Sequence, residues 1–175
     1  MEDNSIDFIA ENLKLGMLIQ NTQFFENDFL TGTPDIIIPD FVFDVKNPWD
    51  FSTFPLLETE IPNTDYYWQG QGYMWLTGRK KYKLIYVLSD TPLHLIRKEA
   101  YYYCMDNGYD ELDDDVYQDF VNKMTYPDVP DHLKIKIFEF ERNDEDIERI
   151  KERVLVCRKI QKQILGNLKK INLNS

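Results

Sequence analysis

The chain alternates between segments in which apolar residues recur every three to four positions and segments in which they alternate or form short runs. The first pattern is typical of amphipathic helices and the second of strands. Helices are expected over residues 6–20, 64–77, 93–105, 116–124 and 144–168. Strands are expected over residues 35–38, 41–45, 82–89 and 133–140. This order predicts an α/β or α+β domain with a central mixed β-sheet flanked by helices.

The first two expected strands are separated only by Pro39-Asp40, a dipeptide typical of a turn. Across a two-residue turn, Asp35 lies directly opposite Asp44, and Lys46 shares the sheet face of Asp44. Opposed carboxylates repel each other, so the pattern favours a cation between them, and a divalent metal with oxygen ligands is the natural occupant. Pro39 suits type I or II turns better than hairpin turns, which leaves a slipped register or a solvated surface hairpin as alternatives.

Asp35, Asp44 and Lys46 are the candidate centre for chemistry on a phosphate. The two carboxylates would clamp Mg²⁺ or Mn²⁺, and the backbone carbonyl of Val45 would be a further oxygen ligand. A metal in this place would lower the pKa of a bound water and stabilise charge on a phosphate oxygen. Lys46 would orient the water or neutralise the charge that develops.

The helix expected over residues 64–77 places Gln69 and Tyr73 on one face, because they are four residues apart. An amide and a phenol can hold a phosphate, a base or a metal-bound water without changing the charge of a site. Gly70 and Gly72 disfavour a helix, so they indicate close approach of the backbone to another group. That group is either a ligand or the sheet itself.

Composition and charge narrow the function classes. The 175 residues fit one domain, and the net charge of −11 counts against tight non-specific binding of DNA. Two local basic tracks remain, one at residues 79–83 and one along the last helix. The acidic run over residues 106–115 is expected to be a solvated loop.

Neither cysteines nor apolar runs indicate a special compartment or cofactor. Cys104 and Cys157 lack the spacing of metal ligands, and both are expected to be buried thiols. Trp68 and Trp75 are likewise expected to be buried in the core. No apolar run approaches the length of a membrane span, and the acidic N-terminus is unlike a signal peptide. A cytoplasmic protein without membrane contact is therefore expected.

Three ordered motifs resemble those of the PD-(D/E)XK nuclease superfamily: Gly32-Thr33-Pro34-Asp35, Asp44-Val45-Lys46 and the Gln-Gly-Gln-Gly-Tyr-Met-Trp-Leu-Thr-Gly run at residues 69–78. The chain is most similar to phage recombination exonucleases of the lambda-exonuclease and YqaJ-like type, and to related RecB-type nuclease domains. The resemblance implies a restriction-endonuclease-like core of order αβββαβ. That core covers about residues 1–92 of a single domain over 1–175, and residues 93–175 form an extension.

The resemblance implies a metal-dependent deoxyribonuclease that uses Mg²⁺ or Mn²⁺ and acts on duplex DNA ends in recombination or repair. Asp35 and Asp44 would be metal ligands, Lys46 the catalytic lysine, Gln69 with Tyr73 the Q-x-x-x-Y element, and Gln71 a further member of it. Arg79, Lys80, Lys81 and Lys83 lie where such proteins would meet the DNA backbone.

A glutamate on the first helix also helps to hold metal in such nucleases. Glu2 fits this place best and Glu11 is the alternative. If Glu2 is the match, the chain starts almost at the motif, without the preceding helices that grip DNA in phage exonucleases. A catalytically degenerate module that binds DNA or protein, and an endonuclease of the same fold, stay open as alternatives. A single-strand annealing protein as partner and a homo-oligomer also stay open, since ring-forming trimers occur in this group.

Overall fold

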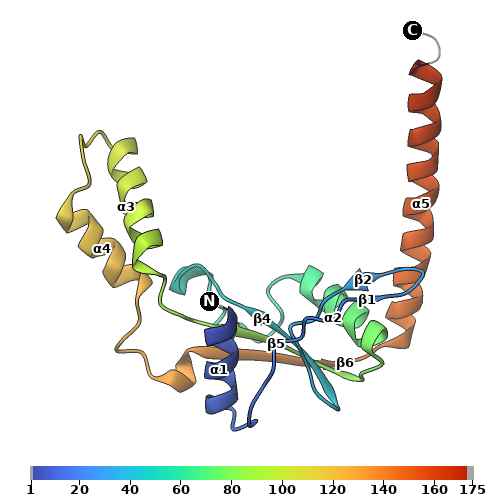
Figure 1. The fold of residues 1–175 in the computed structure, drawn as a ribbon, viewed down its shortest axis with the longest axis horizontal. Helices are drawn as coiled ribbons and strands as arrows, with labels where there is room; N and C mark the ends of the chain where they lie inside the picture. The colour runs from blue at the N-terminus through green and yellow to red at the C-terminus, as the bar shows by residue number, and fades with distance from the viewer. Residues whose placement is uncertain (1, 173–175) are drawn as a thin grey trace.

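The structure is a computed structural model that describes the backbone of residues 2–172 and the side chains of residues 4–167. A four-stranded mixed sheet in the order β3-β4-β5-β6 forms its centre (Figure 1). The strands are β3 (Ile36–Ile37), β4 (Phe41–Lys46), β5 (Lys81–Val87) and β6 (Ile135–Glu141), and a small two-stranded sheet pairs β1 (Phe25–Glu26) with β2 (Thr31–Gly32). The predicted mixed α/β class is confirmed.

Helices account for most of the remaining described chain. They are α1 (Glu2–Asn12), α2 (Thr64–Thr77), α3 (Leu93–Asp106), α4 (Asp114–Met124) and α5 (Asp144–Asn172), with 3-10 turns η1 (Phe51–Thr53) and η2 (Asp131–Leu133). In Figure 1 the α3–α4 pair lies at one end of the sheet and α5 projects from the other. Within residues 2–172, no helix combines the length and the apolar composition that crossing a bilayer requires.

The β3–β4 hairpin has the register expected for a two-residue turn. Ile36 lies opposite Phe43 and Ile37 opposite Val42, and the N–H of Ile38 donates to the carbonyl of Phe41 at 3.0 Å. The same register places residue 35 opposite residue 44. A one-residue slip would move every side chain of a strand to the other face of the sheet, so this register decides where the candidate residues point.

Alternation along β4 separates two cores on opposite faces of the sheet. Val42 packs with Met74 of α2, whereas Phe43 and Val45 pack with Ile9 of α1. The parallel neighbour β5 continues the pattern, and its last partner β6 lies antiparallel to it. Asp44 and Lys46, which alternate in step with Val42, therefore lie on the face that α2 covers.

Several boundaries differ from the expected ones. The first helix ends at Asn12 rather than near residue 20, because Lys14 and Gly16 adopt positive φ angles of 53° and 73° and reverse the chain. The acidic run is not a simple loop, since Asp113 accepts a hydrogen bond from the N–H of Val116 and caps α4. Acidic residues in the first turn of a helix are stabilised by the helix dipole.

Two expectations about burial were wrong. Cys104 is buried as expected, but Cys157 is exposed because it lies on the part of α5 that extends beyond the sheet. Trp68 is 39% exposed although Met74 of the same helix is fully buried. Helical spacing alone did not show which face of α2 lies against the sheet.

Gly70 of α2 allows close packing on the central sheet, and Gly72 lies close to Leu30 between β1 and β2. A Cβ at Gly70 would lie 2.6 Å from Cζ of Phe140 and 2.9 Å from the ring of Tyr82, and one at Gly72 would lie 3.1 Å from Leu30. Carbon atoms in contact lie about 3.5–4 Å apart. The structure therefore supports close packing, rather than contact with a ligand, as the reason for Gly70 and Gly72.

We expect Gly70→Ala to lower the free energy of unfolding by about 1–3 kcal/mol, because the strain of overpacking exceeds the gain in helix propensity. Gly166→Ala is the matched control, since a Cβ at Gly166 on α5 would meet nothing within 4 Å and should instead add about 0.5–1 kcal/mol. Urea denaturation of both variants measures the difference. A Gly70 variant as stable as the Gly166 variant would contradict the packing.

Candidate active site

Two carboxylates meet at the open end of the β3–β4 hairpin. Asp44 lies within β4 and is only 2% exposed. Asp35, just before β3, accepts a hydrogen bond at 2.6 Å from the backbone N–H of Val45. The hairpin thus fixes both acidic residues through its backbone, on elements that the core packing holds in place.

Lys46 supplies the nearest positive charge. Its Nζ lies 2.5 Å from Oδ2 of Asp44 and 4.9 Å from the centre of the Tyr66 ring. Burial alone would lower the pKa of Lys46, but the carboxylates of Asp44 and Asp35 outweigh it and raise the pKa. Lys46 therefore stays protonated at neutral pH, as a group that neutralises charge must.

Gln69 and Tyr73 of α2 lie near this pair and share one face of the helix. The amide Nε2 of Gln69 donates to the hydroxyl of Tyr73 at 3.1 Å. Burial raises the pKa of Tyr73, the hydrogen bond from Gln69 lowers it, and the charges of Asp44 and Asp35 raise it further. Tyr73 is therefore a neutral donor near the two carboxylates.

The glycine of the first motif leaves space for Tyr73. A Cβ at Gly32 would lie 2.5 Å from Cε1 of the Tyr73 ring. Residue 32 must therefore be a glycine for Tyr73 of α2 to pack against the Gly-Thr-Pro-Asp segment. The two elements lie far apart in the sequence. Close packing against the Tyr73 ring therefore explains the glycine at position 32 of the first motif.

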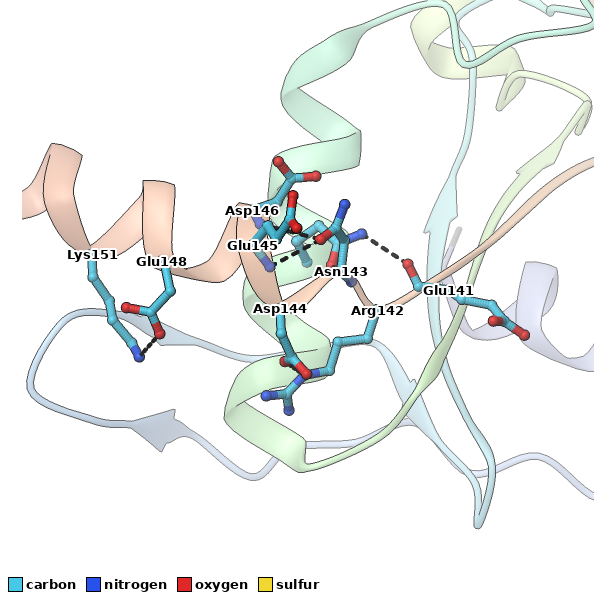
Figure 2. Close-up of polar contacts among 9 residues, drawn as sticks. Glu141, Arg142, Asn143, Asp144, Glu145, Asp146, Glu148 and Lys151 are labelled. Carbon is cyan, nitrogen blue, oxygen red and sulfur yellow. Dashed lines mark hydrogen bonds and ion pairs between the residues drawn. The ribbon is translucent and has the colours of Figure 1, made fainter.

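Gln71 lies away from this cluster. It is fully buried, its Nε2 donates to the carbonyl of Glu141 at 2.9 Å, and its Oε1 accepts from the N–H of Asn143 at 2.8 Å. Figure 2 shows Glu141 and Asn143 at the junction where β6 passes into α5. The side chain of Gln71 therefore joins α2 to the start of α5. Gln71 was predicted to be a catalytic residue, but the structure places its side chain away from the candidate site.

The third carboxylate of the predicted metal site is not placed. Glu2 opens α1, but its side chain lies outside the described residues, and Glu11 is exposed near the other end of that helix. Ser5, one turn after Glu2, donates to Asn47 at 2.6 Å and ties α1 to the segment that follows Lys46. Among the side chains of residues 4–167, no group of three or more His, Cys, Asp or Glu is arranged to hold a metal.

The donor set fits a hard divalent cation nonetheless. Asp35 and Asp44 offer carboxylate oxygens from opposed strand positions, and Val45 between Asp44 and Lys46 offers a backbone carbonyl. Mg²⁺ is usually held by one or two carboxylates together with waters and substrate phosphates rather than by an all-protein cage. These residues could hold such a metal, and Glu2 stays a predicted further ligand.

The predicted DNA-contacting cations do not share this face. Lys81 and Lys83 stack over the ring of Phe41 on the opposite face of the sheet, at 5.5 and 4.7 Å. The guanidinium of Arg79 donates to the carbonyls of Ile38 and Thr77 and so supports the hairpin turn, while Lys80 is exposed nearby. Their role in binding DNA stays a prediction.

Tyrosines that sequence reasoning passed over complete the site. Burial raises the pKa of Tyr82, and the charge of the neighbouring Asp44 carboxylate raises it further. Burial also raises the pKa of Tyr86 to about 12, with contributions from Tyr66 and Asp44. Alternation along the apolar run of β5 is the signal that could have placed Tyr82 and Tyr86 on the face of Asp44.

Comparisons with known proteins find similarity at the level of the fold. No protein-family model matches the sequence, and no curated protein matches it significantly. Among solved structures, the chain is similar to a phage-related exonuclease from Haemophilus somnus 129PT, with 28% identity and a TM-score of 0.74 over 95% of this chain and 70% of that one. These structural neighbours are consistent with the PD-(D/E)XK nuclease superfamily, in its lambda-exonuclease-like group, which the chain resembles.

A second solved structure shares the fold. The alkaline exonuclease LHK-Exo from Laribacter hongkongensis is 14% identical with a TM-score of 0.62, over 99% of this chain and 72% of that one. Its complex with dAMP aligns at 16% identity and a TM-score of 0.61, with the same coverage. Similarity to exonucleases thus supports a nuclease of the phage type.

The raised pKa of Tyr86 predicts loss of stability in alkali. Because the folded state holds the phenol neutral beyond its ordinary pKa of about 10, this contribution is complete below pH 10 and is lost as the pH rises through about 12. We expect the free energy of unfolding of the wild type to fall between these values by about 2 kcal/mol more than that of Tyr86→Phe. Urea denaturation of both proteins across this pH range measures the difference, and parallel curves would contradict the assignment.

Proposed function

We propose that this protein is a metal-dependent deoxyribonuclease, using Mg²⁺ or Mn²⁺, that acts as an exonuclease on the ends of duplex DNA in phage-type recombination or repair. The observation that carries the proposal is the convergence of Asp35, Asp44 and Lys46 on the sheet face beneath Gln69 and Tyr73. The similarity to a phage-related exonuclease over 95% of the chain supports it.

The acidic, basic and neutral residues of the candidate site would have different roles in cleavage. Asp35 and Asp44 would hold the metal, which when bound supplies a water of lowered pKa and neutralises charge on the phosphate. Lys46, kept protonated by the same carboxylates, would hold the attacking water or a phosphate oxygen. Gln69 and Tyr73 would donate to the phosphodiester without adding charge.

Asp44→Asn is expected to abolish cleavage, because it removes a metal ligand from a buried position. The loss should exceed the roughly 10- to 100-fold that removal of an outer-shell partner costs. Asp40→Asn is the matched control, since Asp40 lies exposed in the turn of the same hairpin and should keep full activity. Degradation of linear duplex DNA by the two variants and the wild type, each checked for folding by circular dichroism, makes the comparison. Cleavage by the Asp44 variant at the wild-type rate would contradict the proposal.

The form of DNA that is cleaved distinguishes an exonuclease from an endonuclease and from a binding module of the same fold. Linear duplex and covalently closed circular DNA are incubated with the wild type in Mg²⁺, Mn²⁺ or EDTA. Loss of the linear DNA alone, and only with metal, is the result expected of an end-dependent exonuclease. Nicking of the circle would instead establish an endonuclease. A folded protein that cleaves neither DNA would contradict the proposal and favour a binding module.

Metal binding can be tested without DNA. We expect titration calorimetry with Mn²⁺ to show heat of binding that Asp35→Asn and Asp44→Asn each remove and Asp40→Asn retains. The physical reason is that the two carboxylates are the hard oxygen donors of the site, whereas Asp40 lies away from it. Heat that survives both substitutions would place the metal elsewhere.

A further inference from the structure

The hydroxyl of Tyr82 lies within the apolar core beneath α2. Tyr82 of β5 is 0% exposed, and it belongs to the same core cluster as Val42, Met74, Leu84 and Phe138. Its hydroxyl has no hydrogen-bond partner among the described residues. A buried hydroxyl without a partner lowers stability relative to an apolar group of the same shape. The presence of a phenol at this position therefore needs a reason other than packing.

A phenylalanine would suit the immediate neighbours of this ring equally well. Tyr82 lies opposite Val42 on β4 and opposite Phe140 on β6, and 4.9 Å separates the ring centroids of Tyr82 and Phe140. On the side of α2 the ring faces Gly70, where a Cβ would lie 2.9 Å from it. None of these three neighbours has a side-chain acceptor for the hydroxyl. The glycine of α2 thus makes room for an aromatic ring whose polar atom the surrounding core does not require.

The charged neighbour of this phenol is Asp44. Val42 and Asp44 alternate in step along β4, so Asp44 lies diagonal to Tyr82 on the same face of the sheet. Diagonal neighbours on adjacent strands are within reach of aromatic side chains. Burial is the main cause that raises the pKa of Tyr82, and the charge of Asp44 raises it more than any other neighbour does. The phenol therefore extends from the core toward the acidic end of the candidate site.

Lys46 and Tyr82 lie on different sides of the Asp44 carboxylate. The Nζ of Lys46 lies 2.5 Å from Oδ2 of Asp44, and the side chain of Lys46 is 25% exposed, which places it on the open side. Tyr82 has no exposed surface and lies on the closed side. A divalent cation at this site would compete with the ammonium of Lys46 for the carboxylate. It would not compete with a neutral hydroxyl that donates to the carboxylate from within the core.

We propose that Tyr82 is a positioning residue for the metal site, whose hydroxyl donates to the Asp44 carboxylate and fixes its orientation when a divalent cation binds. The proposal rests on the proposed function, because it supplies the predicted metal ligand with a hydrogen-bond partner. Carboxylates that ligate metals are themselves hydrogen-bonded, and loss of such a partner costs about 10- to 100-fold in metal affinity. This role accounts for a hydroxyl that core packing alone does not require.

Tyr82→Phe removes the hydroxyl and retains the ring. We expect titration calorimetry to show that this variant binds Mn²⁺ about 10- to 100-fold more weakly than the wild type. We also expect its urea midpoint without metal to equal or exceed that of the wild type, since no described residue accepts a hydrogen bond from the hydroxyl. A residue that only supported the fold would show the reverse, with lower stability and unchanged metal affinity.

Tyr126→Phe is the matched control. Tyr126 is another buried tyrosine of the same core cluster, but its hydroxyl donates to the carbonyl of Lys123 at 3.2 Å. Removal of that hydroxyl should lower the urea midpoint and leave the affinity for Mn²⁺ unchanged. Opposite effects of one chemical change at two positions in one core would separate positioning of the metal ligand from general stability.

Cleavage of linear duplex DNA at increasing metal concentration gives a second measurement. Tyr82→Phe should need about 10- to 100-fold more metal than the wild type for half-maximal cleavage, and excess metal should restore most of its rate. Asp44→Asn, which lacks the ligand itself, should stay inactive at every metal concentration. A rescue by metal is expected of a residue that orients a ligand and not of one whose loss disrupts the fold.

Three outcomes would overturn the proposal, and they are distinct. If the wild type binds Mn²⁺ through Asp44 and Tyr82→Phe binds it equally well, Tyr82 has no positioning role and the proposed nuclease stands. If the wild type shows no heat that Asp44→Asn removes, the metal site fails and the role of Tyr82 fails with it. Weaker binding together with a lower urea midpoint and no rescue by excess metal would show that Tyr82→Phe acts through the fold.

Discussion

The structure depends on the repulsion between Asp35 and Asp44 and on the ammonium of Lys46, which offsets it. Two carboxylates at opposed positions of a hairpin, one of them 2% exposed, would destabilise the fold if nothing neutralised them. Lys46 at 2.5 Å compensates one charge and leaves an excess of one. The excess explains why the site suits a divalent cation. The surrounding phenols stay neutral chiefly because burial raises their pKa values, and the negative charge of Asp44 raises them further.

Helix α2 transmits this arrangement to the rest of the molecule. Its buried side, with Gly70 and Met74, lies close on the sheet, and its other residues, Gln69 and Tyr73, face the carboxylates. The same helix carries Trp68 and is joined to α5 by Gln71. A displacement of α2 would thus disturb the candidate site and the junction of α2 with α5 together, so both depend on the glycine-mediated packing.

The sequence predicted the structure correctly where residues close together in the chain determine it. The Pro39-Asp40 turn set the hairpin register, and period-two alternation then placed Asp44 and Lys46 on one face. The predicted helix over residues 6–20 failed because left-handed conformations at Lys14 and Gly16 end it, although the apolar spacing continues. Gln71 and Cys157 could not be placed, because the first depends on how α5 docks on α2 and the second on how far α5 extends beyond the sheet.

An acidic protein can attract a polyanion when its charges are segregated. The acidic cap and first turn of α4 lie at one end of the molecule, and the arginines of α5 lie at the other (Figure 1). At physiological ionic strength, exposed charges separated by more than about 8 Å are largely screened from each other. The arginines of α5 are therefore largely screened from the acidic residues of α4. Net charge then bears on association at long range and low salt, while the local distribution of charge acts at short range.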